Sequence, residues 1–251
     1  MVITSKDNEL IKHIIKLRDK KFRYEFCEYT IEGERLVFDA LKYNQKFVHI
    51  ILTQGKTQHY ASLLDNVDAL VTIVSEDIAK YISSTVSNQG VFAVLKMPQI
   101  SLNLTNKVLI LDNIQDPGNM GTLLRTAAAT DFKTIYLYNC VDVYNDKVLR
   151  STMGGIFRVN AIKVNIENIK QLNEDNYVIF KADMNGENIF SFNENLSKYA
   201  IVVGNEANGV SKEVSNLCKK TISIPMKNSV ESLNAGVSGS ILMYLLSKGE
   251  F

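Results

Sequence analysis

Three loops of the sequence combine glycine, asparagine and charged side chains in a way that suits a polar ligand. The first reads DNIQDPGNMGTLLR (112–125), the second GNEANGVS (204–211) and the third IPMKNSVESLNA (224–235). Each follows a short apolar run that predicts a strand. When such loops lie at corresponding strand ends, they meet at one edge of a sheet and form a ligand site there.

The common nucleotide-binding and hydrolytic motifs are absent from the sequence. There is no GxGxxG, and the glycine pair of GNEANGVSK is not followed at once by the Lys-Ser/Thr of a P-loop. No GxSxG or HExxH occurs, and His13, His49 and His59 all lie in the first half. Histidine acid–base chemistry in the second half is therefore not expected within one subunit.

Cysteine usage argues against a metal centre. Cys27, Cys140 and Cys218 lie far apart, with no Cys or Cys/His spacing typical of zinc. An odd, sparse set of cysteines suits a reducing cytoplasm. The N-terminus is too polar for a signal peptide, and the apolar stretch at 237–246 is too short to cross a bilayer. We therefore expect a cytoplasmic protein with neither a metal nor a membrane partner.

The net charge of +1 and the isoelectric point of about 7.6 do not indicate a nucleic-acid-binding protein as a whole. Basic residues are concentrated near the N-terminus, where the first 24 residues hold seven basic and three acidic side chains. One interpretation is an amphipathic helix with a solvated face. The other is a phosphate-facing RNA surface made by Lys16, Arg18, Lys20, Lys21 and Arg23.

Short apolar runs alternate with helical patterns along the chain, which predicts an α/β protein. In the first half we expect strands at 29–31, 47–52 and 91–95, and helices at 34–43 and at 76–83 after an N-cap at Ser75. In the second half we expect strands at 108–111, 135–138, 178–181, 200–203 and 221–224, and a last helix at 234–247. The second set is apolar on both faces, which is typical of a buried parallel sheet. We place a first domain at 1–98, a linker at 99–106 and a second domain at 107–251.

Together the three loops resemble the signature motifs of the SpoU–TrmH class of SPOUT methyltransferases, over roughly residues 107–247. The first half, with IEGERLVFDAL at 31–41, resembles the small RNA-substrate-binding domain, related to ribosomal protein L30e, that often precedes this catalytic domain. The resemblance implies a C-terminal SPOUT α/β domain with a mostly parallel sheet and a deep C-terminal trefoil knot, after a small L30e-like α/β domain. It also implies a homodimer.

The resemblance further implies methyl transfer from S-adenosylmethionine to a ribose 2′-hydroxyl of RNA. Ribosomal RNA is favoured as the substrate, because the first domain resembles a ribosomal-protein fold, and transfer RNA is the alternative. A non-catalytic RNA-binding or ribosome-assembly protein also stays open. A nucleotide-hydrolysing enzyme lacks the phosphate-binding lysine that it would need.

The roles of the family's motifs carry over to particular residues of this chain. The catalytic residues that the resemblance implies are Arg125, Asn119, Glu206, Ser232 and Asn234. The cofactor-binding residues that it implies are Gly204, Ile224, Met226 and Leu233.

The chemistry of these residues leaves several roles open. A guanidinium stays protonated at neutral pH, so Arg125 is better suited to stabilising a forming alkoxide or binding an RNA phosphate than to acting as a base. Glu206 can favour the positive sulfonium or orient an arginine. Asn119 and Ser232 can also act as helix N-caps.

Overall fold

The computed structural model describes residues 2–64, 69–99, 104–194, 196–228 and 232–249. The chain forms two compact units. The first unit comprises Met1–Gln99 with Tyr144–Phe157, and the second comprises Ile100–Val143 with Arg158–Phe251. The segment Tyr144–Phe157, which the sequence placed within the second domain, thus belongs to the first unit in space.

The first unit is built on a five-stranded mixed sheet in the order β1-β4-β3-β5-β2. Its strands are β1 (Val2–Ile3), β2 (Glu28–Glu32), β3 (Phe47–Thr53), β4 (Leu70–Val74) and β5 (Val91–Lys96). Strand β5 runs antiparallel to both β2 and β3, whereas β1, β4 and β3 are parallel. Its helices are α1 (Glu9–Lys16), α2 (Lys20–Phe26), α3 (Glu34–Lys42), α4 (Ala61–Leu64), α5 (Glu76–Ile82) and α7 (Asp146–Thr152).

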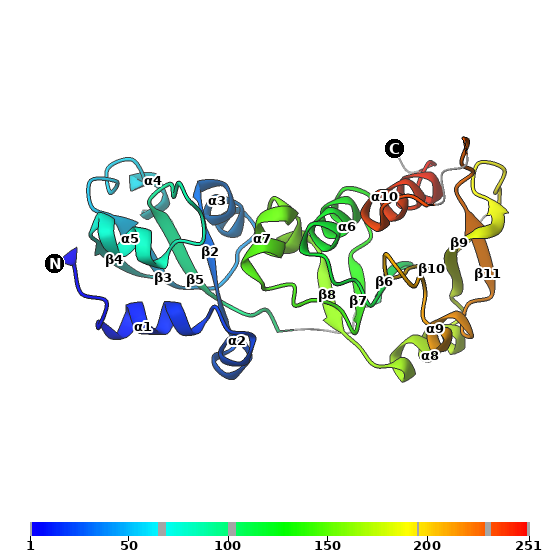
Figure 1. The fold of residues 1–251 in the computed structure, drawn as a ribbon, viewed down its shortest axis with the longest axis horizontal. Helices are drawn as coiled ribbons and strands as arrows, with labels where there is room; N and C mark the ends of the chain where they lie inside the picture. Colours follow the sequence, from blue (N-terminus) through cyan, green and yellow to red (C-terminus); the bar gives the residue numbers. More distant parts are fainter. Residues whose placement is uncertain (1, 65–68, 100–103, 195, 229–231, 250–251) are drawn as a thin grey trace. The chain divides into compact units, whose positions relative to one another are not determined.

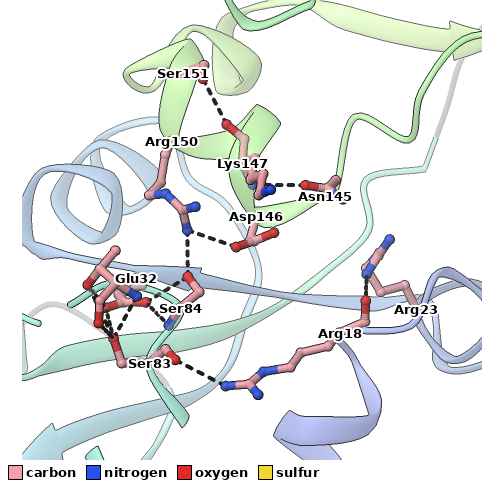
Figure 2. Close-up of polar contacts among 11 residues, drawn as sticks. Arg18, Arg23, Glu32, Ser83, Ser84, Asn145, Asp146, Lys147, Arg150 and Ser151 are labelled. Carbon is pink, nitrogen blue, oxygen red and sulfur yellow. Dashed lines mark hydrogen bonds and ion pairs between the residues drawn. The ribbon is translucent and has the colours of Figure 1, made fainter. Parts of the chain in front are cut away.

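Helix α7 is held in the first unit by an aromatic contact and by the polar cluster that Figure 2 shows. The ring of Tyr144, just before α7, lies 4.6 Å from the ring of Tyr29 between centroids. Arg150 Nη1 donates to Ser84 Oγ at 2.5 Å and to Asp146 Oδ2 at 2.9 Å, and Ser84 in turn donates to Glu32. Burial alone would raise the pKa of Asp146, but the hydrogen bond from Arg150 holds it below its usual value.

The second unit is built on a six-stranded sheet in the order β11-β9-β10-β6-β7-β8, and every neighbouring pair is parallel. Its strands are β6 (Lys107–Asp112), β7 (Thr134–Tyr138), β8 (Asn160–Lys163), β9 (Val178–Asn188), β10 (Tyr199–Val203) and β11 (Lys220–Ser223). Its helices are α6 (Pro117–Ala129), α8 (Ile166–Glu174), α9 (Lys212–Ser215) and α10 (Ala235–Leu246). A 3₁₀ turn, Gly155–Arg158, spans the point where the chain returns to this unit. The α/β class and the mostly parallel sheet are thereby confirmed.

Helices α6 and α10 lie side by side (Figure 1). A Cβ at Gly239 would lie 2.4 Å from the side chain of Leu123, so glycine is what allows this close approach. The hydroxyls of Thr126 and Ser240 are 2.8 Å apart across the same contact. The predicted knot depends on how the chain passes from β11 to α10, and residues 229–231 of that path lie outside the described residues. The knot therefore stays a prediction.

None of the helices in the described ranges is long and apolar enough to cross a lipid bilayer.

Candidate active site

A cavity of about 450 Å³ opens beside the middle of β9, where β10 and β11 end. Its lining includes all four predicted cofactor-binding residues and two of the predicted catalytic residues. These are Gly204, Ile224, Met226 and Leu233, together with Glu206 and Ser232. Loops that are about twenty residues apart in sequence therefore share one site, as expected for strand ends of a parallel sheet.

The second loop is a tight hairpin that begins at Gly204. The N–H groups of Asn205 and Gly209 each donate to the other's carbonyl at 2.9 Å. A Cβ at Gly204 would lie 2.3 Å from the backbone of Gly209 and Val210. Gly204 therefore has to be glycine because its own loop folds back against it. The hairpin presents Glu206 to the cavity.

The first loop contributes Asn119, whose side chain bonds to the second loop and does not cap α6. The N-cap of α6 is Asp116, whose Oδ1 accepts from the N–H of Asn119 at 2.8 Å. The Asn119 side chain is thus not the cap, and its Nδ2 donates to Glu206 Oε1 at 2.6 Å. A second tie runs from Asn205 Nδ2 to the carbonyl of Asn113 at 2.9 Å. These two bonds fix the first and second loops together.

Asp112, at the end of β6, also connects these two loops. It ends β6, it is buried, and its Oδ2 accepts from the N–H of Ser211 at 2.6 Å. Ser211 is also the N-cap of α9. Asp112 Oδ1 has no hydrogen-bond partner among the described residues. The first residue of the first loop thus anchors the last residue of the second.

The third loop ends at Asn234, which is the N-cap of α10. Its Oδ1 accepts from the N–H of Val237 at 3.2 Å. Ser232, for which capping was the alternative role, is exposed and lines the cavity instead. Ile224 and Leu233 are half-buried, so each side chain keeps part of its apolar surface available to a ligand.

Arg125 lies apart from the other predicted catalytic residues. It is exposed, and it does not line the cavity. It follows Asn119 by six positions on α6, which turns it roughly 120° away around the helix. The structure therefore brings Asn119, Glu206 and Ser232 together but leaves Arg125 of the same chain on another face.

Residues 182–184, which sequence reasoning did not identify, also line the cavity. They belong to a bulge in β9, where Lys181 pairs with Thr221 and Glu187 with Ile222. The signal for this bulge is Gly186, since a glycine inside a strand pattern often marks a bulge or a close backbone approach. A Cβ at Gly186 would lie 2.6 Å from the backbone of β11.

The cysteines of the second unit are not suited to covalent chemistry. Burial raises the pKa of both Cys140 and Cys218 to about 12, so both are thiols at neutral pH. Within the described ranges, no group of three His, Cys, Asp or Glu residues is placed to hold a metal ion.

The basic N-terminal segment is divided between α1 and α2 and does not present all of its charges alike. Lys16, Lys20 and Lys21 are exposed. Arg18 is exposed but donates to the carbonyls of Tyr81 and Ser83 at 3.0 and 3.1 Å. Arg23 is buried and donates to the carbonyls of Leu17 and Arg18 at 2.8 and 2.7 Å.

Comparison with protein families finds two matches that cover most of the chain. Residues 106–244 match the family described as the SpoU rRNA Methylase family, and residues 8–93 match the MRM3-like substrate binding domain. A relative from Bacillus subtilis (strain 168), the 23S rRNA (guanosine(2553)-2′-O)-methyltransferase RlmP, is 31% identical over 97% of this chain and 98% of its own. The mitochondrial rRNA methyltransferase 3A of Danio rerio is 28% identical over 95% of this chain and 68% of its own.

Solved structures give the same result. A structure described as an RNA 2′-O ribose methyltransferase is 25% identical, with a TM-score of 0.83 over 100% of this chain and 99% of its own. An AdoMet-bound rRNA methyltransferase from Sinorhizobium meliloti is 24% identical and shares the fold, with a TM-score of 0.88 over 100% and 98%. The resemblance seen in the three loops is confirmed, and with it S-adenosylmethionine as the methyl donor.

Proposed function

We propose that this chain acts on ribosomal RNA at the cavity of the second unit. The chain belongs to the SpoU rRNA methylase family and is an S-adenosylmethionine-dependent RNA 2′-O-ribose methyltransferase. The observation that carries the proposal is the 2.6 Å bond between Asn119 and Glu206. It joins the loop expected to meet the RNA to the loop expected to meet the cofactor. Similarity to RlmP over nearly the whole chain supports ribosomal RNA over transfer RNA.

The cavity has the properties that S-adenosylmethionine requires. Its volume of about 450 Å³ lies within the range of about 300–1,000 Å³ typical of small-molecule sites. Ile224, Met226 and Leu233 supply apolar surface for an adenine face, and their backbone supplies donors and acceptors for its edge. The cofactor carries the methyl group on a positively charged sulfur, which suits a cavity that Glu206 lines with a carboxylate.

The side chains of the site divide between the two reactants. Asn119 holds Glu206 in place through its amide N–H, and its carbonyl oxygen lies beside Gly236 in the first turn of α10. Ser232 offers a hydroxyl at the cavity wall, and Asn234 fixes the start of α10 beside it. Orientation of the ribose hydroxyl towards the methyl donor supplies much of the rate enhancement in such a site.

Arg125 acts, in this proposal, from a second copy of the chain. Its position outside its own cavity supports a homodimer in which each subunit brings Arg125 to its partner's cavity. Exposed apolar side chains on α10, Val237 at 46% and Tyr244 at 49%, support an interface on this side of the second unit. There Arg125 binds the RNA phosphate or stabilises the alkoxide, because a guanidinium that stays protonated does not accept the proton.

The proposal also includes a knotted chain and a cytoplasmic location. A C-terminal trefoil knot, which the family resemblance implies, belongs to the proposal, and the close packing of α10 on α6 is compatible with it. Cys27, Cys140 and Cys218 are all free thiols, which supports a reducing, cytoplasmic setting.

The first unit is proposed to hold the RNA. Lys16, Lys20 and Lys21 present exposed charges to phosphates, while Arg23 shapes the turn between α1 and α2. Replacing the three lysines with alanine should weaken RNA binding and flatten its dependence on salt, since each lost phosphate contact reduces the slope by about 0.7–0.9. Replacing exposed Lys163, Lys170 and Lys212 of the second unit is the matched control. An unchanged salt slope in the first variant would place the RNA elsewhere.

The substrate class is tested by offering purified ribosomal RNA and transfer RNA separately with methyl-labelled S-adenosylmethionine. We expect incorporation into ribosomal RNA, and incorporation into transfer RNA alone would contradict the proposal. Calorimetry with S-adenosylhomocysteine separates this enzyme from a non-catalytic RNA-binding protein, which would bind no cofactor.

A further inference from the structure

The β9 bulge, Ala182–Gly186, is a built feature of the cavity and not an irregular strand end. Gly186 fits only without a Cβ, and its carbonyl accepts from Ser223 Oγ at 2.9 Å. At the other end, Asp183 Oδ1 accepts from the N–H of Asn185 at 3.1 Å. The bulge thus has a defined shape that places Asp183 at the cavity wall, with its carboxylate exposed.

The order of the strands fixes where this carboxylate lies relative to the other residues of the site. Across the sheet the order is β11, β9, β10 and β6. The apolar residue Ile224 follows β11, the bulge belongs to β9, and Glu206 follows β10. Asp183 therefore lies between the slot proposed for adenine and the carboxylate proposed to face the sulfonium.

The part of S-adenosylmethionine between the adenine and the sulfur is the ribose. Its vicinal hydroxyls are two donors, and an ionised carboxylate is an acceptor with two oxygens, so the two groups are complementary. The other charged side chains of the cavity are bonded to side chains of neighbouring elements, Glu206 to Asn119 and Lys181 to Ser215, whereas Asp183 uses one oxygen, Oδ1, within its own bulge. Asp183 is accordingly the carboxylate best placed for the diol.

We propose that Asp183 binds the ribose hydroxyls of S-adenosylmethionine and that the β9 bulge exists to position it. This inference rests on the proposed function of the cavity, because it takes the adenine slot at Ile224 as given. It adds a cofactor-positioning residue outside the three loops.

The test compares two nucleosides that differ in one hydroxyl. Adenosine and 2′-deoxyadenosine are used as competitors of S-adenosylhomocysteine, and their dissociation constants are measured by calorimetry. The wild-type protein should prefer adenosine by about tenfold or more, the usual effect of a hydrogen bond to a charged group. Asp183→Ala should bind S-adenosylhomocysteine about tenfold more weakly and bind the two nucleosides equally well.

Two further variants control for the structure of the bulge. Asp183→Asn keeps an oxygen for the N–H of Asn185, so it should fold normally and still lose part of the preference for adenosine. Glu187→Gln removes an exposed carboxylate of β9 that does not line the cavity, so it should bind as the wild type does. Thermal unfolding of each variant checks that it is folded.

The outcomes separate this inference from the proposed function. If the wild type binds S-adenosylhomocysteine but Asp183→Ala and Asp183→Asn keep the full preference for adenosine, the role of Asp183 is wrong and the function stands. If the wild type binds neither S-adenosylhomocysteine nor adenosine, the proposed function of the cavity is itself wrong.

Discussion

The hydrogen bond from Asn119 Nδ2 to Glu206 Oε1 predicts that the two residues act as one unit. Asn119 is buried, whereas Glu206 is exposed on the hairpin, so water competes for one partner only. A hydrogen bond to a charged group contributes about 1.5–3 kcal/mol, and partial exposure favours the lower end. We therefore expect a coupling of about 1.5 kcal/mol, or about tenfold in rate.

A double-mutant cycle measures this coupling. Single-turnover methyl transfer to RNA is followed for the wild type, Asn119→Ala, Glu206→Ala and the double variant. Once either partner is lost the other is misplaced, so the double variant should be slower than the wild type by about tenfold less than the product of the two single effects. Gln115→Ala is the control, because Gln115 lies in the same loop but bonds to Asn113 and Asn139. Fully multiplicative effects would refute the coupling.

Three further predictions address the dimer, the hairpin and the first unit. Co-expressed Arg125→Ala and Glu206→Ala subunits should regain about one quarter of wild-type activity if each site combines two chains. Half of randomly paired dimers are mixed, and one of the two sites in each mixed dimer is intact. No recovery would place both residues in one chain. Gly204→Ala should weaken S-adenosylhomocysteine binding by calorimetry far more than Gly209→Ala. An added Cβ at Gly204 meets backbone at 2.3 Å, whereas at Gly209 it meets no atom within 4 Å and adds only the strain of a φ of +66°. Equal losses would contradict this packing. Burial would raise the pKa of Glu28, but bonds from Lys96 and His13 hold it below its usual value. Wild-type stability should therefore fall as the pH drops below the usual range of a glutamate, and Glu28→Gln should flatten that dependence in urea unfolding.

The sequence predicts the parts of the fold that depend on local pattern. The apolar runs at 108–111 and 200–203 become the neighbouring central strands β6 and β10, and Ser75 caps α5 as expected. Strand β8 (Asn160–Lys163) is short and half-polar, so its pattern gives no strand signal. Its place at the sheet edge comes from pairing with β7.

The parts that sequence could not supply depend on partners far along the chain. The bond of the Asn119 side chain depends on Glu206, which lies 87 positions away. Arg23 belongs to a basic run, yet its guanidinium is buried because it donates to the carbonyls of Leu17 and Arg18 in the turn before α2. Ile224 and Leu233 are ordinary apolar residues by composition, and only the family resemblance identifies them with the cofactor. The return of Tyr144–Phe157 to the first unit rests on contacts such as Tyr144 with Tyr29.

The most direct test of the central claim is the alkali stability of the methylated product. Purified protein, ribosomal RNA and methyl-labelled S-adenosylmethionine are incubated, and the RNA is then hydrolysed with alkali. Alkaline cleavage needs a free 2′-hydroxyl, so a methyl group on that oxygen leaves a labelled dinucleotide intact. The account predicts label in alkali-resistant dinucleotides. Label confined to mononucleotides, or no label in RNA at all, would contradict it.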